Sequence, residues 1–83
     1  MNNCLITFRS VTPAQRGEGV LRRAGMDCAL QRTPRWMEEQ GCGYSLRLRQ
    51  VDGARAAALL RRNGISFRKV YLQGENFLEE LSV

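Results

Sequence analysis

A six-residue pattern occurs twice in this chain and marks where two helices end. Leu21-Arg22-Arg23-Ala24-Gly25-Met26 returns as Leu60-Arg61-Arg62-Asn63-Gly64-Ile65. Glycine directly after a helix favours the left-handed conformation that closes many helices, and arginine in the last turn faces the negative end of the helix dipole. Each copy therefore predicts a helix end followed by an extended segment. Two explanations fit the pattern: one structural unit used twice, or convergence on a common helix-stop signal.

The segments around the two signals read as strand, helix, strand, strand, helix, strand. Apolar and alternating runs predict the strands, and capping residues predict the helix starts. The expected strands are 4–9, 26–33, 44–49 and 65–72, and the expected helices are 13–24 and 53–63. Thr12 and Asp52 are the predicted N-cap residues, with Pro13 at the first helical position. Gly17 and Gly19 each weaken the first helix by about 1 kcal/mol relative to alanine, which indicates either close packing or looseness there.

This order of elements predicts an α+β chain with the ferredoxin-like split βαβ fold (βαββαβ). Its sheet has four antiparallel strands and two helices on one face. Right-handed crossovers place the strands in the spatial order 4-1-3-2. The other face is left open, and we expect either a second copy in a homodimer or the tail residues Phe77, Leu78 and Leu81 to cover it. Residues 1–74 form the predicted single domain, and 75–83 a short tail or an acidic, amphipathic helix.

The composition excludes several classes of protein. The 83 residues contain no histidine, and the three cysteines form no Cys-x-x-Cys pair. We therefore expect no disulfide framework, no metal site, no bound cofactor and no Cys-His or Ser-His catalysis. No apolar run approaches the length that crosses a membrane, and the expected location is the cytoplasm.

The net charge of +5 comes from twelve arginines and one lysine against eight acidic residues. Such a balance favours an anionic partner. The aromatic residues do not reproduce the pattern of RNA-recognition motifs, and the paired arginines sit at helix ends, where the helix dipole explains them. We therefore do not expect nucleic acid to be the partner.

Cys42 is the candidate reactive residue, because it stands between two glycines where a loop enters a strand. The predicted topology brings this loop to the end of the sheet where the first strand leaves, next to Ser10 and Thr12 at the first helix start. Free N–H groups at a helix start stabilise a thiolate, and Arg9 and Arg35 add positive charge. A lowered pKa of Cys42 follows. The alternative is that Gly41-Cys42-Gly43 serves only as a turn, and Cys4 and Cys28 are expected core residues.

Three segments carry a resemblance to a known family. They are Leu5-Ile6-Thr7-Phe8-Arg9-Ser10, Thr33-Pro34-Arg35 and Cys42-Gly43-Tyr44-Ser45-Leu46-Arg47. Over residues 4–72 the chain resembles a small bacterial domain family described as putative selenium/sulfur carrier-like, with the Pro-Arg and Cys-Gly pairs as its most specific part.

The resemblance implies that Cys42 carries sulfur or selenium as a persulfide. The expected binding residues around it are Arg35, Gly43, Ser10, Thr12, Arg9 and Arg47. A cysteine desulfurase or another sulfur or selenium donor, and an acceptor protein, are the implied partners. The chain is then a carrier or an accessory of sulfurtransferase chemistry rather than a stand-alone enzyme. A regulatory or protein-interaction module that binds a small ligand is the alternative, with RNA binding behind it.

Overall fold

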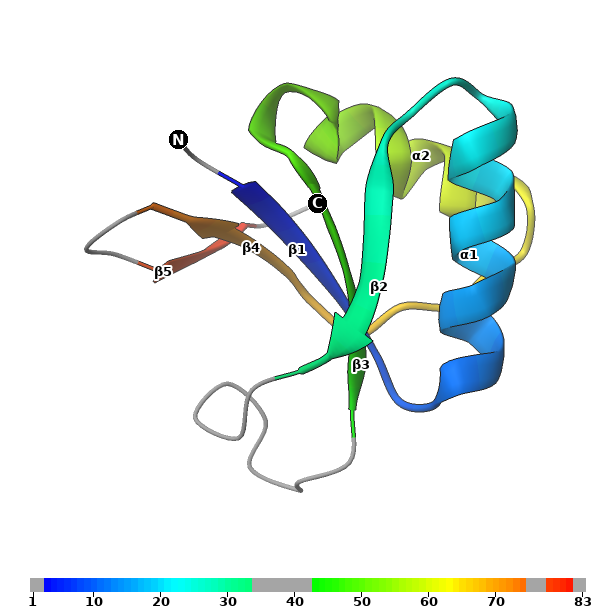
Figure 1. The fold of residues 1–83 in the computed structure, drawn as a ribbon, viewed down its shortest axis with the longest axis horizontal. Coiled ribbons are helices and arrows are strands. Elements are labelled where there is room, and N and C mark those ends of the chain that lie inside the picture. Colours follow the sequence, from blue (N-terminus) through cyan, green and yellow to red (C-terminus); the bar gives the residue numbers. More distant parts are fainter. Residues whose placement is uncertain (1–2, 34–42, 75–77, 82–83) are drawn as a thin grey trace.

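The computed structural model describes residues 3–33, 43–74 and 78–81. Its elements in chain order are β1 (Asn3–Phe8), α1 (Val11–Arg23), β2 (Cys28–Arg32), β3 (Tyr44–Arg49), a 3-10 turn (Gln50–Asp52), α2 (Gly53–Arg62), β4 (Val70–Gln73) and β5 (Leu78–Leu81). The strands form one antiparallel sheet in the order β2-β3-β1-β4-β5. Both helices lie on the same side of this sheet, and together they form the second layer (Figure 1).

The α+β class and the order of the first four strands are as predicted, but the sheet has five strands rather than four. Of the two alternatives expected for 75–83, a short tail or a helix, the helix is wrong for 78–81, which pair with β4 from Gln73 opposite Leu78 to Val70 opposite Leu81. A helix this short is marginal in water, because few hydrogen bonds offset the cost of nucleation. The free edge of β4 offers the same backbone groups a ladder of partners. Phe77 lies outside the described residues.

The strand β4 begins five residues later than expected, at Val70 instead of residue 65, because the ladder to β1 is interrupted before it. The Thr7 N–H donates to the carbonyl of Lys69 (2.8 Å), while the N–H of Arg68 donates to the carbonyl of Thr7 (2.7 Å). Two residues thus oppose one, which is the arrangement of a β-bulge. The displaced Lys69 N–H donates to the Thr7 hydroxyl instead (3.1 Å).

The start of α1 differs from the prediction. Ser10, in an extended conformation, is the N-cap residue, and the helix begins at Val11 rather than after Thr12. Pro13 is then the third helical residue. Its missing N–H is one of the first four that have no intrahelical partner in any helix, so the proline is tolerated. At α2 the predicted N-cap Asp52 is correct in position, although its carboxylate pairs with Arg49 (3.4 Å) and caps no helical N–H.

Both helices end as the repeated pattern predicts. Gly25 and Gly64 have positive φ values of 83° and 69°, which glycine adopts without steric cost. In each case the N–H of the following residue bonds back to the carbonyl of a buried leucine in the last helical turn. These bonds are Met26 to Leu21 (3.0 Å) and Ile65 to Leu60 (2.9 Å). Each helix therefore ends in its own Schellman motif, and equivalent carbonyl groups accept hydrogen bonds in the two motifs.

The hydrophobic core lies between the helices and the sheet. It takes alternate residues of the central strands, among them Cys4, Ile6, Phe8, Leu46 and Leu48. Gly17 brings α1 close to this layer: an added Cβ would lie 3.1 Å from Leu60 Cδ2 and 3.3 Å from Leu46 Cδ1. Gly19, by contrast, has open space around it. Close packing therefore explains the first glycine and not the second.

The opposite face of the sheet is buried at its centre within a single copy of the chain. Leu5, Thr7 and Ser45 are exposed by only 1%, 3% and 0%. Farther along β3 on the same face, Arg47 and Arg49 are exposed to solvent. The centre of this face is therefore buried without a second copy of the chain, although the prediction of an open sheet face suggested that a homodimer would cover it.

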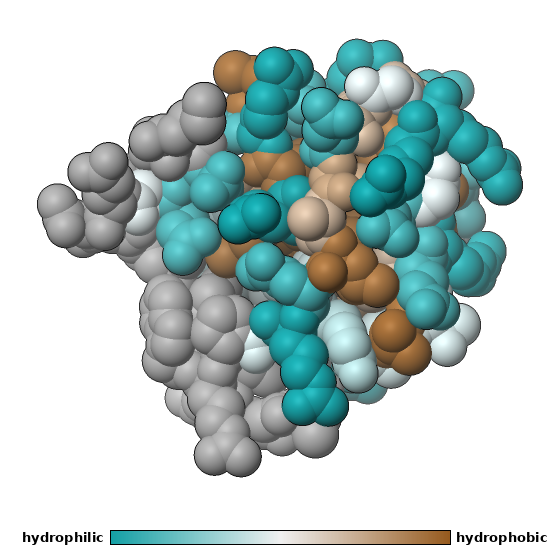
Figure 2. Space-filling model, viewed as in Figure 1, coloured by the Kyte–Doolittle hydropathy of each residue, from teal (hydrophilic) through white to brown (hydrophobic). Residues whose placement is uncertain are grey.

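Hydrophilic side chains cover much of the described surface in the view of Figure 2, with smaller hydrophobic areas between them. Among the residues that the structure describes, neither α1 nor α2 combines the length and the apolar character needed to span a bilayer.

Candidate functional site

The sheet end at which β1 leaves gathers several of the predicted residues. The last residue of β1, Phe8, lies opposite Tyr44, the first residue of β3, and Tyr44 also lies opposite Arg32 at the end of β2. The pairing continues one residue further, where the N–H of Thr33 donates to the carbonyl of Gly43 (2.9 Å). Gly43 is buried. The residue that follows Cys42 in the chain is therefore anchored at the predicted end of the sheet.

The N-terminus of α1 lies at the same end. Ser10 accepts no hydrogen bond from the helix through its side chain, and the first turn contains no acidic residue. Arg9, Ser10 and Thr12 are all exposed. The first N–H groups of a helix and its dipole carry partial positive charge, so this surface favours anions such as a thiolate.

Arg9 and Ser10 also line a cleft that the sequence patterns did not indicate. The cleft has a volume of about 540 Å³, and among the residues that the structure describes its other lining residues are Pro13 on α1 and the segment from Ser66 to Lys69. Sequence reasoning assigned 65–72 to a regular strand and so missed this wall. The sequence held one signal against a regular strand in this segment. Arg68 and Lys69 are adjacent cations, and a regular strand would direct their side chains to opposite faces of the sheet.

The structure does not bring every predicted residue to this place. Arg47 lies within β3 opposite Leu5 and Ala29, away from the strand end. It lines a separate depression of about 260 Å³ together with Asp27 and Arg49. Cys42 and Arg35 lie outside the described residues, so their predicted roles stay predictions.

The other two cysteines are core residues, as expected. Cys4 is exposed by only 1%, and burial raises the pKa of its thiol from 9.0 to about 11. Burial also raises the pKa of Cys28, which is 8% exposed, although the charge of the Arg22 guanidinium acts in the opposite direction. Neither thiol is favoured as a thiolate near neutral pH.

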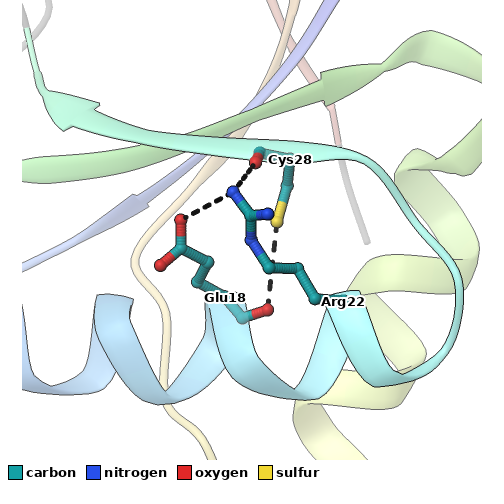
Figure 3. A network of polar contacts seen from close by, with 3 residues as sticks. All are labelled: Glu18, Arg22 and Cys28. Atoms are coloured by element: carbon teal, nitrogen blue, oxygen red, sulfur yellow. Dashed lines mark hydrogen bonds and ion pairs between the residues drawn. The ribbon is translucent and has the colours of Figure 1, made fainter.

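Figure 3 shows how Cys28, the first residue of β2, is held against α1. Arg22 donates to the Cys28 carbonyl (2.9 Å) and to the Glu18 carboxylate (3.3 Å). The Cys28 thiol points toward the carbonyl of Glu18, 4.0 Å away. These contacts tie the first residue of β2 to the last turns of α1 and leave the thiol a structural role.

Two buried hydroxyl groups flank the segment 34–42. Thr33 Oγ1 and Ser45 Oγ have no hydrogen-bond partner among the described residues, and the two residues are 9% and 0% exposed. A buried hydroxyl without a partner loses the hydrogen bonds it would make in water. Both groups therefore keep the capacity to bind a polar atom. Within 3–33, 43–74 and 78–81, no three cysteine or acidic side chains gather in a metal-binding arrangement.

Comparison with curated proteins and with solved structures found no match. A family model, however, matches residues 3–72, which is most of the chain and includes β1, the strand end at Gly43 and the bulged segment before β4. The matched range also includes all three cysteines. The chain therefore belongs to the family described as "Putative Se/S carrier protein-like".

Proposed function

We propose that this protein carries sulfur or selenium on the thiol of Cys42. In the transfer step, the Cys42 thiolate attacks the terminal sulfur of a persulfide on a donor protein. The bond between the two donor sulfurs breaks, the donor cysteine leaves as a thiolate, and Cys42 becomes a persulfide. An acceptor then takes the terminal sulfur by the same exchange. The step needs an ionised thiol and no general base, which suits a chain without histidine.

The observation that carries this proposal is the burial of the other two thiols. The chain has three cysteines, and two of them lie in the core with raised pKa values. A buried, protonated thiol neither reaches a donor protein nor attacks its persulfide. If the family's carrier chemistry uses a cysteine of this chain, Cys42 is the one left for it.

The surroundings of Gly43 support an ionised Cys42. Consecutive Cα atoms lie about 3.8 Å apart, so the anchored Gly43 limits how far Cys42 can lie from this end of the sheet. The same end holds the N-terminus of α1, which has no acidic residue in its first turn, and the guanidinium of Arg9. In the proposal, Ser10, Thr12 and Arg9 stabilise the thiolate, and Arg35 orients the transferred atom.

Donor and acceptor proteins are the partners that a carrier requires. In our proposal the donor is a cysteine desulfurase or a selenium-delivering counterpart, and the transfer takes place in the cytoplasm. Arg47 and Arg49, both exposed on β3, attract an acidic surface of a partner. The homodimer that the open sheet suggested stays a proposal.

Intact-protein mass spectrometry tests the transfer. The purified protein is incubated with a cysteine desulfurase and L-cysteine, and we expect a gain of one sulfur atom on Cys42, located by peptide mapping. Cys42→Ser abolishes the gain, whereas the matched variant Cys28→Ser keeps it. A sulfur adduct that persists in Cys42→Ser, or no adduct on the unaltered protein under conditions that load a known carrier, contradicts the proposal.

A further inference from the structure

We infer that Asn63 is a site of spontaneous deamidation and that the end of α2 controls the rate of the reaction. Asn63 precedes Gly64 in the second copy of the repeated helix-end pattern, whereas the first copy has Ala24 at the equivalent position. Asparagine is chemically labile before glycine, because no Cβ obstructs the approach of the glycine backbone nitrogen to the asparagine side chain. Asn63 is exposed, so water and hydroxide reach its side chain.

The reaction consumes only water. The backbone nitrogen of Gly64, deprotonated by hydroxide, attacks Cγ of Asn63 and forms a bond to it. The C–N bond of the side-chain amide breaks, and its nitrogen takes up a proton from water and leaves as ammonia. A second water molecule opens the resulting cyclic imide at either carbonyl, which leaves aspartate or isoaspartate in place of Asn63. No oxidation or reduction takes place, and both products carry a new carboxylate.

The folded end of α2 engages both reacting groups in hydrogen bonds. The N–H of Gly64 donates to the carbonyl of Arg61 (3.1 Å), so the nitrogen that must lose its proton is a hydrogen-bond donor. The side-chain amide of Asn63 donates to the carbonyl of Leu59 (2.8 Å), which holds the side chain against the last turn of the helix. Both bonds must break before the nitrogen of Gly64 reaches Cγ of Asn63.

Packing holds this end of the helix in place. The N–H of Ile65 bonds to the carbonyl of Leu60 (2.9 Å), and both residues lie in the core, exposed by 4% and 0%. The Arg61 guanidinium lies 5.3 Å from the centre of the Phe67 ring and adds a contact across the turn. Deamidation therefore proceeds from the fraction of molecules in which the last turn of α2 is open.

The product weakens the helix end in two ways. A carboxylate at this residue lies at the C-terminal end of the helix dipole, which disfavours negative charge. A carboxylate also has no N–H to donate to the Leu59 carbonyl. Arg16 and Arg23 of α1 line the same surface depression as Asn63, but exposed ion pairs contribute little and do not offset these losses. Deamidated molecules therefore open at this end more often than unmodified ones.

Peptide mapping by mass spectrometry at mildly alkaline pH tests the inference. We expect Asn63 to be converted to aspartate and isoaspartate at least about tenfold faster in urea than in the folded protein. The slowing in the folded protein follows the hydrogen-exchange protection of the Gly64 N–H, since both report the opening of the same turn.

Two matched variants separate the role of the helix end from the lability of the Asn-Gly pair. Ala24→Asn places a second Asn-Gly pair at the end of α1, where the backbone angles (φ −83°, ψ 4°) are close to those of Asn63 (φ −95°, ψ 10°). We expect this pair also to react more slowly in the folded protein than in urea. Asn63→Asp lowers the melting temperature by about 4 °C or more, and Asn63→Ala by less, because alanine adds no charge at the helix end.

Three results would overturn the inference. Equal rates in buffer and in urea would show that the helix end exerts no control. An unchanged Asn63 in urea, after a time that converts a short Asn-Gly peptide, would remove the site itself. An Asn63→Asp variant as stable as the unaltered protein would contradict the effect on α2. The reacting atoms belong to Asn63, Gly64 and water, so these results are independent of whether the protein carries sulfur.

Discussion

Replacing Gly17 by alanine tests whether α1 is held against the sheet by the absence of one side chain. Alanine favours an exposed helix interior by about 1 kcal/mol over glycine. At Gly17 the new Cβ would lie 3.1 to 3.4 Å from Leu60 Cδ2, Leu46 Cδ1 and Phe8 Cζ, on three different elements. All three of these side chains are 0% exposed and cannot move into solvent. Overpacking of this kind costs about 1 to 3 kcal/mol, so we expect a net loss of about 1 kcal/mol in the free energy of unfolding.

The matched variant Gly19→Ala makes the same chemical change two residues along the same helix. Its Cβ meets nothing within 4 Å, so the helix preference of alanine acts alone and stabilises the fold by about 1 kcal/mol. Urea denaturation followed by circular dichroism measures both, and a difference of about 1 kcal/mol moves the melting temperature of so small a domain by about 4 to 8 °C. Equal stabilisation by Gly17→Ala and Gly19→Ala would refute the packing argument.

Three further predictions concern the helix ends, the alkaline range and the contact between α1 and β2. Gly25→Ala and Gly64→Ala each lower stability by about 1 kcal/mol, because alanine strains at the positive φ values found there; no loss in urea denaturation would be inconsistent with the two Schellman ends. Burial raises the pKa of Cys4 from 9.0 to about 11, so the fold favours the protonated thiol: stability is unaffected below about pH 9 and falls as the pH rises toward 11. Cys4→Ala shows a smaller fall over that range, and identical pH profiles would contradict the assignment. Arg22→Gln removes the 2.9 Å bond to the first carbonyl of β2 and lowers stability by about 1 kcal/mol, whereas Arg23→Gln, exposed one residue later, leaves it unchanged.

Features set by local chemistry were predictable from the sequence. The arginines and the glycine at each helix end predicted where α1 and α2 stop, and the alternation of apolar and polar residues in 44–49 predicted β3. Each of these signals acts within a few residues. The topology then placed Arg9, Ser10 and Gly43 at one end of the sheet. Such an inference needs only the strand order, because the ends of neighbouring antiparallel strands meet.

Features that depend on a distant part of the chain were not predictable in the same way. The strand β5 exists because β4 offers a free edge, and its four residues carry no strand signal that outweighs their reading as a short amphipathic helix. The bulge at Arg68 and Lys69 depends on the Thr7 hydroxyl, far away in the sequence. Consequently the second wall of the cleft, unlike Arg9 and Ser10, was missed.

The rates at which the three cysteines are alkylated in the folded protein show whether Cys42 is the ionised, accessible thiol of this chain. At about pH 7.5, a thiol with a pKa of about 11 is ionised to about 0.03%, against about 3% for an ordinary thiol of pKa 9.0, and burial slows access further. With limiting iodoacetamide and peptide mapping, we expect Cys42 to react at least about 100-fold faster than Cys4, and well before Cys28. Similar rates for all three, or earlier modification of Cys4 or Cys28, would contradict the assignment of Cys42 as the carrier thiol.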